Sequence, residues 1–190
     1  MICLNPISIR KKVVGKSNNG ERVSVPCGKC SACLSNRRND WIIRLTEELK
    51  QHDCAAFLTL TYSDENLTFG QNSPTLVKED LQKFIKLLRY YVSRPLRYYA
   101  VGEYGTKTKR PHYHLIVFNL HHINDIDNVQ KAWTKGHSLV GDVNIRSISY
   151  VAKYHVNKVD NVEGEQKSFC CMSLKPPIGI AYVEKKKVPR

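Results

Sequence analysis

The sequence RYYAVGEYGTKTKRPHYHLIVFN, residues 97–119, predicts two β-strands joined by a loop. Residues 97–104 and 112–119 are rich in aromatic and β-branched side chains, which favour an extended backbone. The link between them, residues 105–111, holds glycine, proline and polar residues that are typical of a hairpin loop. Because consecutive strands pair directly in a hairpin, this stretch favours an antiparallel sheet over a wound parallel one.

Apolar residues outside this stretch follow helical spacing in some segments and strand spacing in others. In residues 78–92 they recur at i, i+3, i+4 and i+7, which makes this segment the clearest helix of the chain. The other expected elements are helices at 35–52, 125–135 and 148–158 and strands at 54–62 and 139–147, with most of the last 30 residues irregular. The sequence therefore predicts an α+β fold with a largely antiparallel sheet flanked by helices.

The composition indicates a basic globular protein. Lys and Arg number 30 against 17 Asp and Glu, which gives a formal net charge of +13 in 190 residues. Such a charge favours a polyanionic partner, and 42% hydrophobic residues exclude a disordered basic tail. No window approaches the roughly 18 apolar residues of a membrane helix, and the first residues lack the apolar core of a signal peptide. We therefore expect a cytosolic protein with no membrane partner.

Two histidines of the second strand, His112 and His114, share one face because side chains alternate along a strand. Such a pair alone is more often one core and one surface histidine than a metal site. With the turn centred near Thr108, however, Glu103 falls opposite position 113, between the two imidazoles. Two imidazoles and a carboxylate leave positions open on a divalent ion, which suits Mg²⁺ or Mn²⁺ acting on a phosphate, although Zn²⁺ or Fe²⁺ use such ligands in other folds.

Two tyrosines four positions apart, Tyr150 and Tyr154, share one face of the helix expected at 148–158. Lys153 follows Tyr150 by three positions, and Lys158 follows Tyr154 by four. A phenol, with a pKa of about 10, is a poor nucleophile unless cations stabilise its anion and a metal polarises the group it attacks. Without a metal site nearby, the tyrosines are better explained as core residues and the lysines as a solvated face.

Three segments in order along the chain, FLTLTY (57–62), PHYHLIVF (111–118) and YVAKY (150–154), resemble the motifs of the HUH endonucleases that initiate rolling-circle replication. PCGKC (26–30) with Cys33, and MSLKPPIG (172–179), resemble more closely the replication initiators of small single-stranded-DNA phages, the Microviridae and especially their gokushovirus branch. The resemblance covers nearly the whole chain.

This resemblance implies the HUH fold, a central antiparallel sheet of the ferredoxin or RRM type flanked by helices. It implies that His112 and His114 bind a metal with Glu103 as the third ligand, and that Tyr150 and Tyr154 are the nucleophiles. Such an enzyme nicks single-stranded origin DNA, forms a 5′-phosphotyrosine and leaves a 3′-OH that primes synthesis. The ends are later rejoined without ATP, and the second tyrosine allows one chain to cut and transfer twice.

The resemblance also implies partners. No Gly-x-x-x-x-Gly-Lys-Ser/Thr loop occurs in the chain, so we expect a host helicase to unwind the DNA. A host DNA polymerase and single-strand-binding protein are expected partners in the cytoplasm of the infected bacterium. Around the metal, Lys107, Lys109 and Arg110 of the loop are placed to contact DNA phosphates. Tyr113, with Tyr104 nearby, is expected to stack on unpaired bases, while the alternative for Tyr113 is packing against a helix.

Seven cysteines occur in the chain, and three form the pattern Cys27-x-x-Cys30-x-x-Cys33. In a reducing compartment this spacing favours metal over disulfides, and Cys3 could complete a tetrahedral structural Zn²⁺ site. The alternative fourth ligands are His52 and Cys54, and the alternative to a metal is a set of free buried thiols, which we expect for Cys54, Cys170 and Cys171.

The chain is expected to divide into three parts. Residues 1–34 form a basic, cysteine-containing arm, 35–160 the catalytic core, and 161–190 a basic extension of the same domain. The rival functions are a non-enzymatic, zinc-pinned nucleic-acid-binding module, and the same nicking chemistry in a plasmid initiator, a relaxase or a transposase.

Overall fold

The computed structural model describes residues 2–10, 22–154, 156 and 163–187. Among these, no helix is both long and apolar enough to cross a bilayer. The elements in chain order are β1 (Ile7–Arg10), β2 (Arg22–Val25), α1 (Ser31–Leu49), β3 (Ala55–Tyr62), the 3₁₀ turn η1 (Asp64–Asn66), α2 (Lys78–Val92), β4 (Arg97–Tyr104), β5 (Pro111–Phe118), α3 (Ile126–Ala132), β6 (Gly136–Asp142), α4 (Ile145–Tyr154), β7 (Phe169–Met172) and α5 (Ile180–Lys187).

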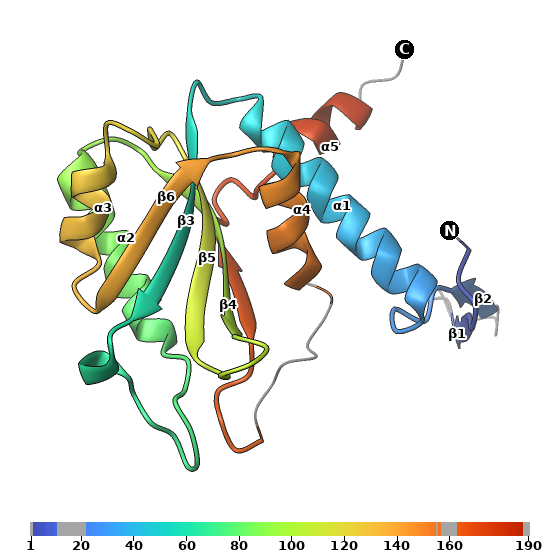
Figure 1. Cartoon of the computed structure of the whole chain (residues 1–190). Coiled ribbons are helices and arrows are strands. Elements are labelled where there is room, and N and C mark those ends of the chain that lie inside the picture. The colour runs from blue at the N-terminus through green and yellow to red at the C-terminus, as the bar shows by residue number, and fades with distance from the viewer. Residues whose placement is uncertain (1, 11–21, 155, 157–162, 188–190) are drawn as a thin grey trace.

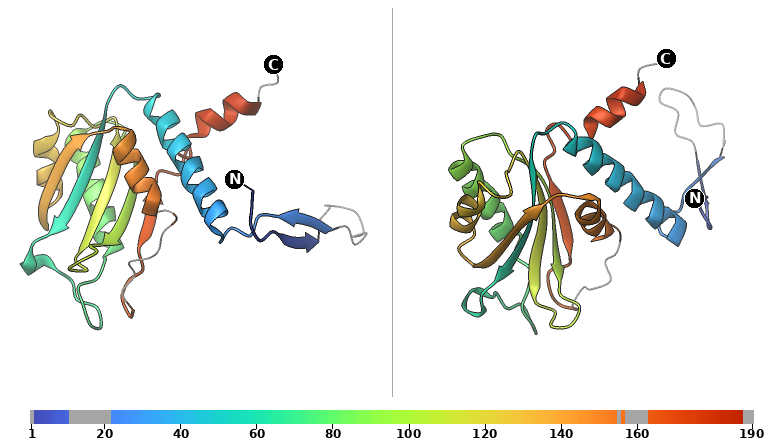
Figure 2. Two further views of the ribbon diagram at one scale, coloured as in Figure 1. Left: turned by 45° about the vertical axis from the view of Figure 1, so that its right-hand side comes forward. Right: turned by 45° about the horizontal axis from the view of Figure 1, so that its top comes forward.

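Five of the strands form one sheet in the order β6-β3-β5-β4-β7, and each neighbouring pair is antiparallel (Figure 1). The predicted hairpin β4–β5 supplies the central strand, β5, and its neighbour. The remaining two strands, β1 and β2, form a separate hairpin at the start of α1 (Figure 2). The predicted α+β fold with an antiparallel sheet flanked by helices is confirmed, and it agrees with an HUH-like arrangement.

Helices cover both faces of the sheet, and each face has its own core. On one face, α2 and α3 bury apolar side chains that include Phe84 and Val129 against the strands. On the other, α1 and α4 bury side chains that include Leu45 and Val151 (Figure 1). Because residues alternate between the faces along a strand, each strand supplies both cores.

The central elements match the sequence predictions closely, and the peripheral ones do not. Strand 97–104 and helix 78–92 have the predicted bounds. The hairpin register differs by one position, because Glu103 pairs with His112 rather than with position 113. The arm contains a hairpin and the first turn of α1, and the last 30 residues contain β7 and α5, which were expected to be irregular. Short edge strands such as β7 carry too few residues to show a period.

The strand expected at 139–147 begins earlier, at Gly136, and ends at Asp142. Gly136 has a φ of +157°, and a Cβ atom there would lie 2.2 Å from the carbonyl oxygen of Thr61 in β3. Only glycine allows the two backbones to approach so closely, so a residue that signals a turn in the sequence begins a strand. Helix α4 accordingly starts at Ile145, three residues before the expected start.

The prediction that Tyr113 stacks on DNA bases is wrong, as is the same prediction for Tyr104. Both are almost fully buried on the α2 face. The hydroxyl of Tyr113 lies 2.7 Å from that of Tyr62, and it donates to the carbonyl of Val77 at the start of α2. Tyr62 donates in turn to Asp80. Tyr113 therefore packs against a helix because it lies between two histidines that face the other way.

A buried carboxylate joins α1 to the opposite end of the sheet. Glu48 of α1 accepts hydrogen bonds from the guanidinium of Arg97 on β4 and from the amide of Gly179, 2.7 Å away. His52 lies 3.3 Å from the same carboxylate. Burial opposes ionisation, but these partners outweigh it and hold the pKa of Glu48 below its usual value. His52 is thus engaged here rather than with the cysteines.

Removing the buried hydroxyl by Tyr113→Phe is expected to lower the free energy of unfolding by about 1–3 kcal/mol, because the amide of Val77 loses its acceptor. Urea unfolding followed by circular dichroism measures the difference. The matched control is Tyr90→Phe, at a tyrosine that is 75% exposed, which should leave stability unchanged. Equal stability of both variants would contradict the buried network.

Glu48→Gln is expected to cost about 2 kcal/mol of unfolding free energy near neutral pH, since the hydrogen bonds to a charged acceptor weaken. Because the folded pKa of Glu48 is lowered, its contribution is complete above the unfolded value of about 4.5 and is lost as the pH falls through the folded value. Unfolding measured from pH 7 to pH 3 should show the gap between variant and parent closing. A gap that stays constant, or an equal effect of Glu47→Gln at the exposed neighbouring pair, would contradict this account.

Candidate active site

The site lies where β4 and β5 pair, on the sheet face that α1 and α4 cover. Glu103 is directly opposite His112, and Val101 is opposite His114. Strand alternation places Glu103, His112 and His114 on this face and Tyr113 on the other. Thr59 of β3 is the cross-strand partner of His114 on its other side. The structure therefore brings together the three residues that the sequence predicted as metal ligands.

The two imidazoles converge on one carboxylate oxygen. Glu103 Oε1 lies 2.9 Å from His112 Nε2 and 3.1 Å from His114 Nε2. The second nitrogen of each ring is also held, since His112 Nδ1 lies 3.1 Å from the carbonyl oxygen of Arg110 and His114 Nδ1 lies 3.0 Å from Thr59 Oγ1. Partners on Nδ1 that aim Nε2 at a common point are typical of metal-ligating histidines.

The carboxylate of Glu103 has features that fit a cation. It is 3% exposed, and its second oxygen, Oε2, is buried with no hydrogen-bond partner among the described residues. Burial opposes its ionisation, but the two imidazoles outweigh this and lower the pKa of Glu103 to about 2. One ligand atom from each of Glu103, His112 and His114 lies within 4.8 Å of the others. Nitrogen and oxygen donors of this kind suit Mn²⁺, Mg²⁺ or Zn²⁺.

Helix α4 places the two tyrosines above this cluster. The hydroxyl of Tyr150 lies 3.2 Å from Glu103 Oε1 and 3.3 Å from His114 Nε2. The ring of Tyr154 meets that of Tyr150 edge-on with centroids 5.1 Å apart, and it stacks over His114. Burial raises the pKa of both phenols, and the negative charge of Glu103 beside them raises it further. Without a cation, the cluster thus keeps both tyrosines protonated.

The start and the inner face of α4 explain its position. Asn144 accepts hydrogen bonds from the amides of Arg146 and Ser147, and Ser147 Oγ accepts one from the amide of Asn144. These reciprocal bonds cap the helix. Ile148 and Val151 are buried against the sheet. The tyrosines follow on the side of the helix that faces the metal ligands.

Sequence reasoning missed Arg146. An open cleft of about 380 Å³ lies beside His114 and Tyr150, and Arg146 lines it together with Phe57, Asp142, Asn144 and Ser147. The pattern Asn144-x-x-Ser147 is a capping signal that could have placed the helix start three residues earlier. Arg146 would then have appeared four positions before Tyr150, on the same helix face.

The lysines of the prediction are spread around the site rather than gathered in it. Lys153 is exposed, and its Nζ lies 5.6 Å from the ring centre of Tyr154. Lys107 is exposed in the hairpin loop, and Lys109 is half-buried there. Arg110 is engaged within the protein, because it pairs with Asp64 and donates to the carbonyl of Tyr62. Lys158 lies outside the described residues.

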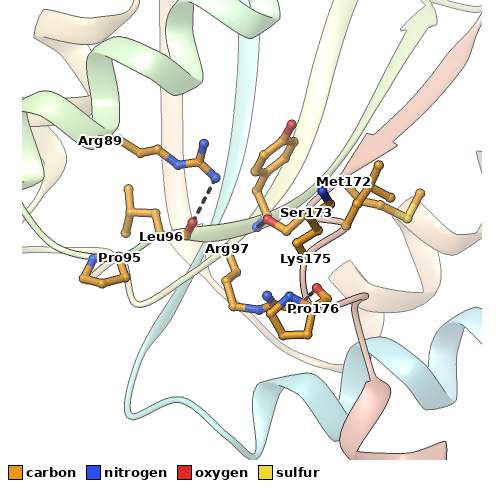
Figure 3. Close-up of a pocket in the computed structure, with 10 residues that line it drawn as sticks. Arg89, Pro95, Leu96, Arg97, Met172, Ser173, Lys175 and Pro176 are labelled. Atoms are coloured by element: carbon orange, nitrogen blue, oxygen red, sulfur yellow. Dashed lines mark hydrogen bonds between the residues drawn. The ribbon is translucent and has the colours of Figure 1, made fainter.

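A larger cleft, of about 670 Å³, lies at the other end of β4 (Figure 3). Arg89, Arg97 and Lys175 line it, but Arg97 is paired with Glu48 and Arg89 donates to the carbonyl of Leu96. None of the predicted site residues lines this cleft, so its size does not make it the candidate site.

The four predicted zinc ligands also come together. One sulfur atom from each of Cys3, Cys27, Cys30 and Cys33 lies within 4.8 Å of the others. Backbone amides lower the pKa of Cys27, and they lower that of Cys30 to about 6. The rival fourth ligands, His52 and Cys54, do not belong to this group.

Comparison with known proteins identifies the family. The model of the replication-associated protein ORF2 family matches residues 55–159, which include Glu103, both histidines and both tyrosines. The chain is 32% identical over 200 aligned positions to replication-associated protein ORF2 of Spiroplasma virus 4, with 84% of this chain and 62% of that protein covered. It is 32% identical over 218 positions to replication-associated protein VP4 of Bdellovibrio phage phiMH2K, with 97% and 68% covered.

A third relative is replication-associated protein ORF4 of Chlamydia phage 1, which is 39% identical over 98 residues, or 50% of this chain and 24% of that protein. The chain therefore spans about two thirds of the length of the first two relatives. No solved structure matches it. The resemblance to the replication proteins of small single-stranded-DNA phages is confirmed, and this chain belongs to the replication-associated protein ORF2 family.

Proposed function

We propose that this protein is a replication initiator that nicks single-stranded origin DNA through a tyrosine and later rejoins the ends. The observation that carries the proposal is the contact of one tyrosine hydroxyl with the candidate metal ligands. The hydroxyl of Tyr150 lies within 3.3 Å of both Glu103 and His114. A phenol in that position can attack a phosphate bound at the same ligands.

The residues fit a divalent cation, Mg²⁺ or Mn²⁺, held by Glu103 Oε and by the Nε2 atoms of His112 and His114. Bound there, the cation supplies a Lewis acid that polarises the scissile phosphate and offsets the charge that develops on it. The chain's own contribution is orientation. Thr59 and the carbonyl of Arg110 hold the imidazoles so that both Nε2 atoms face Glu103.

Tyr150 is the proposed first nucleophile. Its oxygen forms the bond to phosphorus while the bond from phosphorus to the 3′ oxygen breaks, which leaves a 5′-phosphotyrosine and a free 3′-OH. The phenol proton is released to the solvent of the open cleft, since the side chain is 39% exposed. The phosphotyrosine keeps the energy of the original phosphodiester, so a DNA 3′-OH can later reverse the step.

Tyr154 is the proposed second nucleophile. It lies one helical turn after Tyr150, with ring centroids 5.1 Å apart, so a small movement of the strand or the helix exchanges one phenol for the other. While the first tyrosine holds the 5′ end, the second can cut the regenerated origin. Two nucleophiles on one helix allow both cuts within one chain.

Cations around the cleft are proposed to hold the DNA strand. Arg146 lines the cleft itself, and Lys107 and Lys109 lie on the loop that leads into β5. These groups give part of the +13 net charge a role in binding phosphates, and they carry no base specificity. Host helicase, DNA polymerase and single-strand-binding protein in the infected bacterium complete the proposed reaction.

The central test is formation of a covalent adduct on single-stranded oligonucleotides that tile the phage genome, with Mn²⁺ present. Tyr150→Phe is expected to reduce the SDS-stable adduct by about a hundredfold or more, because it removes the phenol that touches the metal ligands. Tyr154→Phe is expected to form the first adduct and to fail in the second transfer. Tyr90→Phe, at an exposed tyrosine far from the site, is the matched control.

An adduct that persists in Tyr150→Phe, in His112→Ala or in EDTA would contradict the mechanism. If every tile binds the protein and none forms an adduct with the parent protein, the function is instead that of a nucleic-acid-binding module.

The Thr59–His114 hydrogen bond gives a second test. Thr59→Val keeps the shape of the side chain but removes the group that orients His114. We expect the Mn²⁺ concentration for half-maximal adduct formation to rise by about ten- to a hundredfold, with full activity restored at high Mn²⁺. Thr61→Val removes a neighbouring hydroxyl on the same face that bonds only to the carbonyl of His137, and it should not shift the titration. Equal titrations for the two variants would show that Thr59 does not orient a ligand.

A further inference from the structure

The cysteine cluster lies away from the candidate active site, at the junction of the β1–β2 hairpin and α1 (Figure 2). Cys3 precedes the hairpin, Cys27 and Cys30 follow it, and Cys33 lies in the first turn of α1. Segments far apart in the sequence thus meet through sulfur atoms. The replication chemistry proposed above uses none of these residues.

The distances between the sulfur atoms match a tetrahedral metal site. Cys3 Sγ lies 3.9 Å from Cys30 Sγ, and Cys27 Sγ lies 4.0 Å from Cys33 Sγ. A tetrahedron with Zn–S bonds of about 2.3 Å has sulfur–sulfur edges of about 3.8 Å. A disulfide would require about 2.05 Å. The cluster therefore has the size of a metal centre and not of a pair of disulfides.

Backbone amides point at these sulfur atoms. The amides of Lys29 and Cys30 donate to Cys27 Sγ over 3.5 and 3.4 Å, and the amide of Cys27 donates to Cys3 Sγ over 3.3 Å. Gly28, with a φ of +74°, allows the tight turn that aims the first two. Amide donors favour the thiolate form, which is the form that binds a metal.

The arm that these cysteines hold has no hydrophobic core of its own. None of the described residues in 2–10 and 22–30 is buried, and every residue of β1 is exposed. Two four-residue strands are marginal in water without a packed face. The first buried residues are Ala32 and Cys33, inside α1. Some interaction other than apolar burial must fix the arm, and a metal centre at its base supplies one.

We propose that Cys3, Cys27, Cys30 and Cys33 form a closed, structural Zn²⁺ site that fastens the β1–β2 hairpin to the start of α1. Four thiolates select Zn²⁺ over the harder Mg²⁺ and Mn²⁺ expected at the histidines. With all four positions filled by sulfur, the ion has no site for water or substrate, so its role is structural.

The site also explains how the arm is placed relative to the tyrosines. Helix α1 begins at the cluster and packs along α4, which carries Tyr150 and Tyr154. The remainder of α1 is held by apolar residues, Trp41 and Leu45 among them. Loss of the metal should therefore release the arm and leave the five-stranded core folded.

Metal analysis of the full chain, purified under reducing conditions, tests the proposal. We expect one zinc ion per chain in the parent protein and loss of that zinc in Cys30→Ser. Exchange for Co²⁺ should give the intense sulfur-to-cobalt charge-transfer bands and the visible bands of tetrahedral thiolate coordination. Cys54→Ser, which changes a cysteine outside the cluster, is the matched control and should keep both the zinc and the spectrum.

A double variant, His112→Ala with His114→Ala, separates this site from the candidate active site and should retain the zinc and the cobalt–thiolate bands. If Cys30→Ser does not fold, titration of the parent protein with a mercurial reagent gives a second measurement. The zinc should then be released in step with four thiols.

Three results would overturn the proposal. They are a parent protein without zinc or cobalt–thiolate bands, zinc that depends on the histidines and survives in Cys30→Ser, and a mass that is lower by the hydrogens removed on forming two disulfides. None of them bears on whether Tyr150 forms a DNA adduct.

Discussion

The pairing register of β4 with β5 is the constraint on which the site depends. It places Glu103 opposite His112, so one buried carboxylate oxygen meets both imidazole Nε2 atoms. A shift of one residue in either strand would turn these side chains to the opposite face and bury charge in an apolar core. Burial of Glu103 is costly on its own, and the two imidazoles offset that cost, since they hold its pKa at about 2.

Two sets of contacts maintain this register from opposite sides of the sheet. Below it, Tyr113 lies between the histidines in sequence and fixes β5 to the start of α2 through buried hydroxyl bonds. Above it, α4 is held by apolar packing, and its cap at Asn144 sets the rotation that brings Tyr150 to Glu103. Stability and chemistry thus use alternate residues of the same strand, which explains why a buried network and a polar site coexist within one hairpin.

The sequence predicted the central hairpin, the helix over 78–92 and the convergence of Glu103 with both histidines, because these elements have long, regular patterns. It did not predict β1, β2 and β7, whose four residues each show no period, or the early start of β6, where Gly136 serves close backbone contact rather than a turn. The base-stacking role of Tyr113 failed because alternation from His112 places it on the other face. Arg146 was missed because the capping signal at Asn144 was not used to set the start of the helix.

Peptide mapping of the DNA adduct tests the central claim, that the phenol held against Glu103 and His114 is the one that cuts. Trypsin cleaves after Arg146 and after Lys153, so Tyr150 and Tyr154 fall in different peptides, SISYVAK and YHVNK. For the first adduct formed by the parent protein in Mn²⁺, the account predicts that mass spectrometry finds the 5′-nucleotide on SISYVAK. A first adduct on YHVNK, or on any peptide that contains neither tyrosine, would contradict it.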